Sequence, residues 1–160
     1  TLHYFNAGFD AIIANPFVGW NGGLDVVFKE AKARGKGVIL LCYMSHPGAH
    51  EGYGQFVRTE NFETLLPQYL VFAKKAVKWG ADGIIVGATY PDKIKEIKEV
   101  VNQKCLIFSP GVGAQGGDIY ATLRAGADFI IVGRAIYNAE NPKKAAEEIL
   151  NGIHRIQYEV

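Results

Sequence analysis

Two loops near the C-terminal end of the chain carry residue types suited to holding a phosphate group. The first, residues 109–118, has the sequence SPGVGAQGGD. Its glycines lack a side chain, so backbone N–H groups can approach an anion closely. The second loop places Gly133 and Arg134 directly after an apolar run. A guanidinium offers a planar set of donors that match phosphate oxygens. A glycine-rich stretch alone is more often a simple turn, but the two loops together predict a phosphate site.

A repeated segment indicates the elements that position these loops. Residues 8–14 (GFDAIIA) return as residues 80–86 (GADGIIV) and again as residues 126–132 (GADFIIV). Each copy has a glycine suited to ending a helix, then an aspartate, then a β-branched run without polar alternation. Such runs predict strands that are buried on both faces, as in parallel sheets covered by helices.

The full pattern predicts five strand–helix units in a single domain, residues 1–160. Residues 37–43 and 104–108 supply two further strands, and helical patterns follow the five strands at residues 24–34, 63–79, 91–102, 119–125 and 141–154. Regular alternation of this kind predicts one parallel sheet, either open or part of a closed barrel. A closed eight-unit barrel typically needs about 250 residues. In both folds ligands bind where the strands end, which is where the two loops lie.

Three motifs resemble the orotidine 5′-phosphate decarboxylase family, especially its archaeal-type branch. They are MSHPGA at residues 44–49, SPGVGAQGGD at 109–118 and IVGRAIY at 131–137, the last followed by Asn141 and Pro142. The resemblance implies about five C-terminal βα units of a (β/α)8 TIM barrel, with the N-terminal units lacking. It implies formation of UMP from orotidine 5′-phosphate in pyrimidine biosynthesis, by a cytoplasmic homodimer that uses no metal and no organic cofactor.

The same resemblance implies six substrate-binding positions, at the ends of three strands: Ser45, Pro110, Gly111, Gln115, Gly133 and Arg134. By this resemblance Arg134 and the amide of Gly133 would hold the 5′-phosphate. Gln115 would reach over the phosphate and the pyrimidine from a mobile loop, and Ser45 would hydrogen-bond the pyrimidine ring. The remaining two residues would line the pocket where the closing loop begins.

The catalytic residues of that family are not present in this sequence. The family's reaction depends on an Asp-x-Lys-x-x-Asp segment at an earlier strand end, together with another lysine and aspartate before it. The nearest candidates here, residues 25–29 and the pair Asp92 and Lys93, fall in predicted helices and are interpreted as solvated helix charges. Since Thr1 also falls inside a helical pattern, we expect the missing units to precede it. We therefore assign no catalytic residue and expect the isolated chain to be inactive.

Two other functions fit part of the pattern. Sugar-phosphate barrel enzymes of the hexulose-phosphate synthase and keto-gulonate-phosphate decarboxylase type share the Gly-Arg strand end but lack the PGVGAQ loop. The chain could also be a non-catalytic phosphate-binding fragment with an open sheet edge. Binding of a pentose phosphate but not of UMP would favour the first alternative over the decarboxylase. Protection of the backbone from amide exchange tests the second alternative.

Composition limits the partners. The 17 basic and 16 acidic residues leave a net charge of +1, so no global field attracts nucleic acid or an anionic membrane. The apolar runs are far shorter than the roughly 20 residues that span a bilayer. Cys42 and Cys105 lie in apolar strands and are expected to be buried free thiols.

Two further segments are weighed for function. His46 and His50 have the spacing of two metal ligands on one helix face, but Pro47 and Gly48 between them disfavour that helix, so no metal site is expected. Residues 51–61 form a long predicted loop, and long loops in compact barrels are often lids.

Overall fold

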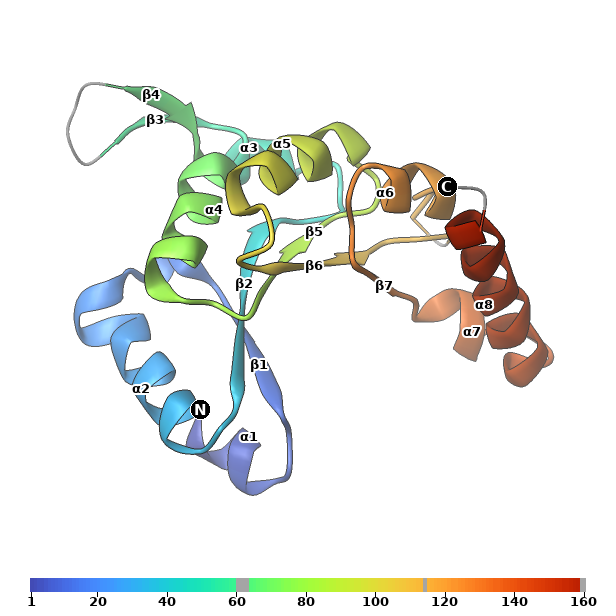
Figure 1. Ribbon diagram of the computed structural model, residues 1–160, viewed down its shortest axis with the longest axis horizontal. Coiled ribbons are helices and arrows are strands. Elements are labelled where there is room, and N and C mark those ends of the chain that lie inside the picture. The colour runs from blue at the N-terminus through green and yellow to red at the C-terminus, as the bar shows by residue number, and fades with distance from the viewer. Residues whose placement is uncertain (60–63, 114, 159–160) are drawn as a thin grey trace.

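The computed structural model describes residues 1–59, 64–113 and 115–158 of the chain. A five-stranded sheet runs through it in the order β1-β2-β5-β6-β7, and every neighbouring pair is parallel (Figure 1). The strands are β1 (Ala11–Ala14), β2 (Gly37–Tyr43), β5 (Gly83–Val86), β6 (Leu106–Pro110) and β7 (Phe129–Ile131). The five predicted strands and their parallel arrangement are therefore confirmed.

A helix follows each of these strands, as the sequence pattern predicts. The helices are α2 (Asp25–Ala33), α4 (Gln68–Trp79), α5 (Pro91–Val101), α6 (Ile119–Arg124) and α8 (Pro142–Tyr158). Shorter helical elements are α1 (Leu2–Asn6), η1 (Pro16–Val18), η2 (Trp20–Leu24), α3 (Ala49–Tyr53) and α7 (Arg134–Tyr137). Pro91 at the first position of α5 needs no donor there, and Gly80 ends α4 in the left-handed conformation with a φ of 72°.

A small hairpin interrupts the second unit. Strand β3 (Phe56–Arg58) pairs antiparallel with β4 (Leu65–Pro67). The predicted start of a helix at residue 63 is therefore wrong, because the residues just before Gln68 pair with β3 instead. The segment 51–61 is likewise not one long loop: it contains the end of α3 and all of β3, while residues 60 and 61 lie outside the described residues. Its role as a lid stays a prediction.

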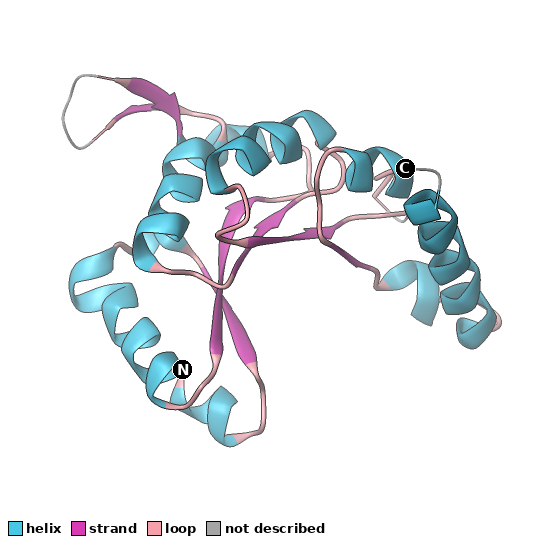
Figure 2. Ribbon diagram, viewed as in Figure 1, coloured by secondary structure: helices cyan, strands magenta, loops and turns pink. Residues whose placement is uncertain are grey.

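The two faces of the sheet differ in burial. The helix-covered face forms the core, where Val38, Leu40 and Ile84 are each at most 1% exposed. On the opposite face Ile13 is 59% and Phe129 is 50% exposed. In the part of the chain that the structure describes, no helix covers that face (Figure 2). Burial on both faces, predicted for all three repeat strands, is thus correct for β5 and wrong for β1 and β7. The reason is that no described helix packs on that face, and the exposure extends beyond the edge strands, since Leu106 of β6 is 45% exposed.

The repeated aspartate ties each strand to its neighbour. The Oδ2 atom of Asp82 accepts a hydrogen bond of 2.8 Å from the backbone N–H of Val38, and Asp128 Oδ2 accepts one of 2.8 Å from Ile107. In the first copy Asp10 instead pairs with Lys36, with an Oδ1–Nζ distance of 2.6 Å. The repeat therefore encodes alignment of the strand starts, at the end of the sheet away from the glycine-rich loop.

The two cysteines are free and buried, as predicted. The Cys105 thiol donates to the carbonyl oxygen of Ala81 at 3.2 Å. Burial raises the pKa of both thiols, so neither forms the reactive thiolate readily. Within the described ranges, no helix has the length and apolar character needed to cross a membrane.

Candidate functional site

A hollow of about 240 Å³ lies between the ends of β6 and β7. The register places Pro110 opposite Ile131, so the loops that follow the two strands begin side by side at the same edge of the sheet. The hollow is lined by Pro110, Gly111, Val112, Gln115, Ile131, Gly133, Arg134 and Tyr137. The structure thus brings together five of the six residues singled out from the sequence. The sixth, Ser45, is absent from this lining but lies against Gly111.

The loop after β6 folds back on itself, and its glycines make this possible. The N–H of Gly117 donates to the carbonyl oxygen of Gly111 at 3.1 Å, and Gly113 N–H donates to Gly117 at 3.1 Å. Gly111, Gly113 and Gly116 have φ values of 100°, 70° and 84°, a region that other L-residues rarely adopt. Residue 114 lies outside the described residues. The described part of the loop is therefore a compact turn whose backbone strongly favours glycine at these three positions.

Arg134 is the only charged side chain among the described residues that line the hollow. It begins α7 directly after Gly133, and its side chain forms no ion pair with another described residue. A guanidinium without a carboxylate partner beside a concave surface favours binding of an external anion. The hollow therefore has the charge and the donors that phosphate binding needs.

Ser45 is held in a narrow gap between two glycines. A Cβ atom added to Gly87 would lie 2.6 Å from Ser45 Cα, and one added to Gly111 would lie 2.8 Å from Ser45 Cβ. The same atom on Gly111 would lie 2.7 Å from Gln115 Oε1. Ser45 and Gln115 therefore converge on Gly111 from two different loops.

Two residues after β5 fasten the Ser45 loop from the other side. The Thr89 hydroxyl donates to the carbonyl oxygen of Ser45 at 2.8 Å, and the Tyr90 hydroxyl donates to that of His46 at 3.1 Å. Sequence reasoning missed both residues. The sequence feature that could have identified them is their position just after a predicted parallel strand, where the loops of neighbouring strands meet.

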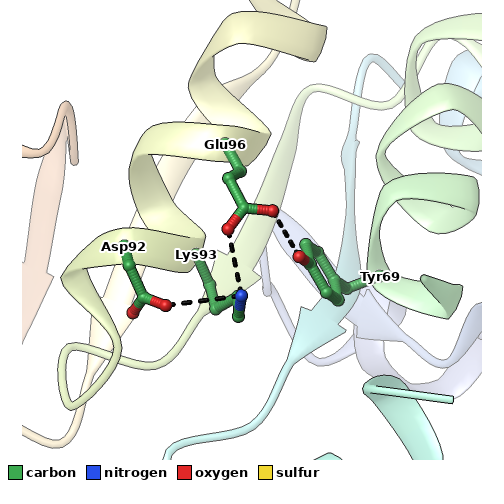
Figure 3. A network of polar contacts seen from close by, with 4 residues as sticks. All are labelled: Tyr69, Asp92, Lys93 and Glu96. Atoms are coloured by element: carbon green, nitrogen blue, oxygen red, sulfur yellow. Dashed lines mark hydrogen bonds and ion pairs between the residues drawn. The ribbon is translucent and has the colours of Figure 1, made fainter. Parts of the chain in front are cut away.

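The charged pair Asp92 and Lys93 lies in α5, away from the lining of the hollow. Lys93 Nζ contacts Glu96 Oε1 at 3.0 Å and Asp92 Oδ2 at 3.3 Å, while the Tyr69 hydroxyl donates to Glu96 (Figure 3). Burial lowers the pKa of Lys93, but its bonds to Glu96 and Tyr69 outweigh this effect and raise it. The location in a helix is as predicted. The interpretation as a solvated charge is correct for Asp92, whose side chain is 66% exposed, and wrong for Lys93, whose side chain is 26% exposed and lies over the Tyr69 ring of α4 at 5.1 Å.

The remaining candidates lie outside the lining of the Arg134 hollow. Asp25 and Lys29 lie in α2, as predicted from the sequence, but the interpretation as solvated charges is wrong for Asp25, whose Oδ1 atom is buried. His50 lies in α3 and its Nδ1 is 2.8 Å from the carbonyl oxygen of Pro47, whereas His46 precedes that helix. The two histidines therefore do not share one helix face.

Comparison with known proteins finds a matching family and a relative that belongs to it. The sequence model described as "Orotidine 5′-phosphate decarboxylase / HUMPS family" matches residues 2–149. Orotidine 5′-phosphate decarboxylase of Methanosarcina mazei is 42% identical over 149 residues, which make up 93% of this chain and 62% of that protein. The chain therefore spans a little under two thirds of the relative's length.

Solved structures agree with this match. Orotidine 5′-monophosphate decarboxylase from Sulfolobus solfataricus aligns with a TM-score of 0.74 and 32% identity, over 92% of this chain and 62% of that one. The enzyme from Methanocaldococcus jannaschii, in complex with the inhibitor BMP, aligns with a TM-score of 0.73 and 37% identity, over 88% and 59%. The expected fold class, part of a (β/α)8 TIM barrel, is confirmed. None of these findings supports the sugar-phosphate or the non-catalytic alternative.

Proposed function

Because the chain belongs to the orotidine 5′-phosphate decarboxylase / HUMPS family, we propose that it supplies the phosphate- and pyrimidine-binding loops of an enzyme that decarboxylates orotidine 5′-phosphate to UMP. The observation that carries this proposal is the hollow shared by the glycine-rich loop and Arg134. A guanidinium and glycine amides at adjacent strand ends suit a phosphoryl group.

Each residue of the site has a proposed role. Arg134 pairs with the 5′-phosphate, and the amide of Gly133 donates to it. Gln115, whose Oε1 faces Gly111, bridges the phosphate and the pyrimidine. Ser45 hydrogen-bonds the ring, since its loop is fixed beside Gly111. Pro110 and Gly111 form the wall of the pocket at the start of the closing loop.

The rest of the catalytic machinery is proposed to lie outside this sequence. Loss of CO2 from the substrate's carboxylate leaves the bonding electron pair on the ring as a carbanion, which must be protonated in a water-poor site. The lining of the hollow contains no lysine and no carboxylate among the described residues. We therefore propose that the 160-residue chain binds UMP but does not catalyse decarboxylation, and that it needs neither metal nor organic cofactor to bind.

The exposed sheet face supports the proposed architecture. Residues 1–160 form one partial barrel domain, and Ile13 and Phe129 on its uncovered face pack against further βα units in the whole protein. The whole protein is proposed to act as a homodimer in the cytoplasm.

Calorimetric titration of the chain with UMP tests the phosphate site. We expect saturable binding that Arg134→Ala weakens by about 10- to 100-fold, because a charge-assisted hydrogen bond is worth about 1.5–3 kcal/mol. The matched control is Arg124→Ala, since Arg124 stacks on the Tyr120 ring at 4.3 Å in α6, outside the hollow's lining. Equal loss in both variants, or preferential binding of ribulose 5-phosphate over UMP, would contradict the proposal.

A separate assay tests the proposed lack of catalysis. The purified chain is incubated with orotidine 5′-phosphate, and UMP formation is followed by chromatography. We expect no UMP above the level of a protein-free sample. Turnover that copurifies with the chain would refute this part of the proposal while leaving the phosphate site untouched.

A further inference from the structure

A pair of stacked tryptophans lies far from the Arg134 hollow in sequence and shares no lining residue with it. Trp20, in η2, stacks on Trp79 at the end of α4, with ring centroids 5.1 Å apart and an interplanar angle of 29°. Phe28 of α2 packs on Trp20 at 5.3 Å. Gly19 and Gly22, with φ values of 84° and 69°, turn the chain so that η2 reaches α4. These are the only two tryptophans in the sequence.

Two hollows adjoin the tryptophan pair. One of about 500 Å³ is lined by Trp20, Asn21, Lys75, Lys78 and Trp79. The other, of about 820 Å³, also contacts both tryptophans and extends along α2 toward the start of β2. We call their union the tryptophan groove, with Trp20, Phe28, Lys29, Lys32, Lys75 and Trp79 as its defining residues. Both hollows are larger than the one at Arg134, and both fall within the size range of ligand-binding clefts.

The groove has an excess of basic side chains in a chain whose net charge is only +1. Five lysines line its two hollows, at positions 29, 32, 36, 75 and 78, against the two carboxylates at positions 25 and 82. One of these lysines is already paired, because Lys36 Nζ lies 2.6 Å from Asp10 Oδ1. Lys29, Lys32 and Lys75 form no ion pair with any other described residue. Such a local field favours an anionic partner.

The arrangement of the lysines favours an extended anion over a compact one. Lys29 and Lys32 are three residues apart on α2, and Lys75 and Lys78 are three residues apart on α4. Residues at this spacing lie on one side of a helix, about 4.5 Å apart along its axis. The lysines thus form two rows rather than one cluster. Trp20 and Trp79 line the hollow beside each row and give both an apolar surface, and Lys75 Nζ lies 5.6 Å from the centroid of the Trp79 ring.

We propose that the tryptophan groove binds an acidic peptide segment of a partner protein. Carboxylates spaced along an extended peptide meet the two lysine rows, and aliphatic side chains between them pack on the indole rings. This function is independent of the proposed decarboxylase site, because the groove and the Arg134 hollow have no lining residue in common.

Intrinsic tryptophan fluorescence tests the proposal directly, since both tryptophans report on the groove. The chain is titrated with the capped peptide Glu-Leu-Glu-Glu-Leu-Glu and with the same peptide carrying Lys for Glu. We expect saturable change with the acidic peptide only, weakening as salt is added. The affinity of the exposed double variant K29E/K32E for the acidic peptide should fall by roughly tenfold or more. The affinity of K143E/K144E, on α8, should equal that of the unchanged chain.

Further measurements guard against misinterpretation. Circular dichroism establishes that each variant is folded, and K75Q provides a second, milder test of the same groove. Equal binding of both peptides, or full binding by K29E/K32E and K75Q, overturns the proposal. Displacement of the acidic peptide by millimolar benzoate, with saturation at one site, also overturns it and assigns the groove to small aromatic anions. Persistence of UMP binding in K29E/K32E separates this result from the fate of the decarboxylase proposal.

Discussion

Replacing Gly87 with alanine places a methyl group against backbone atoms that have little room to move. The added Cβ would lie 2.6 Å from Ser45 Cα and 2.9 Å from both Ser45 N and Met44 O. Ordinary contacts between carbon atoms are about 3.5–4.0 Å. The backbone at Gly87 does not require glycine, since its φ is not among the positive values. The expected effect is therefore steric, and it acts on the loop that carries Ser45.

The size of the effect follows from the rigidity of these neighbours. Overpacking with one methyl group typically costs about 1–3 kcal/mol. We expect the upper part of that range, about 3 kcal/mol, because all three contacts are with backbone and separating the loops strains the 2.8 Å bond from Thr89 to the Ser45 carbonyl. At about 2–4 °C per kcal/mol for a domain near this size, the midpoint of thermal unfolding falls by about 6–12 °C.

Thermal unfolding followed by circular dichroism measures this change, and UMP titration measures its effect on the site. The matched control is Gly52→Ala in α3, where an added Cβ meets no described atom within 4 Å. There we expect a change below about 1 kcal/mol, in the stabilising direction. We also expect UMP affinity to fall in Gly87→Ala and to persist in Gly52→Ala. A Gly87→Ala midpoint within about 2 °C of the control would refute the steric argument.

Three further predictions concern stability. In urea unfolding, Ile84→Ala should lower the free energy of unfolding by about 2–5 kcal/mol, whereas Ile13→Ala on the uncovered face should change it little; similar losses would contradict the assigned sheet faces. Asp82→Ala should cost about 1.5 kcal/mol through its bond to a backbone N–H, and more than Asp10→Ala, whose carboxylate pairs only with a lysine side chain. Burial raises the pKa of Tyr53, so above the unfolded-state pKa of about 10 the unfolded state binds fewer protons than the folded state, and stability falls as the pH rises through the folded pKa. Midpoints of thermal unfolding measured at increasing pH should therefore fall less steeply in Tyr53→Phe.

Local sequence determined most of the parallel sheet and the outline of the candidate site. The three Gly-x-Asp repeats fixed the starts of β1, β5 and β7 because a helix-ending glycine and a β-branched run act over a few neighbouring residues. The glycine-rich loop and Arg134 were identifiable because both follow such strands, and parallel strands deliver their ends to one edge of the sheet. These features need no knowledge of distant contacts.

Tertiary structure decided the features that join distant segments. Residues 65–67 form a strand only because they pair with Phe56–Arg58, so helical propensity alone misplaced the start of α4. The Thr89 bond to the Ser45 carbonyl spans 44 residues, and the Trp20–Trp79 stack depends on the turn at η2. Exposure of side chains on β1 and β7 depends on which segments pack on that face of the sheet, and no described helix does. Periodicity and propensity describe short-range preferences, whereas each of these outcomes is set by which segments the folded chain brings into contact.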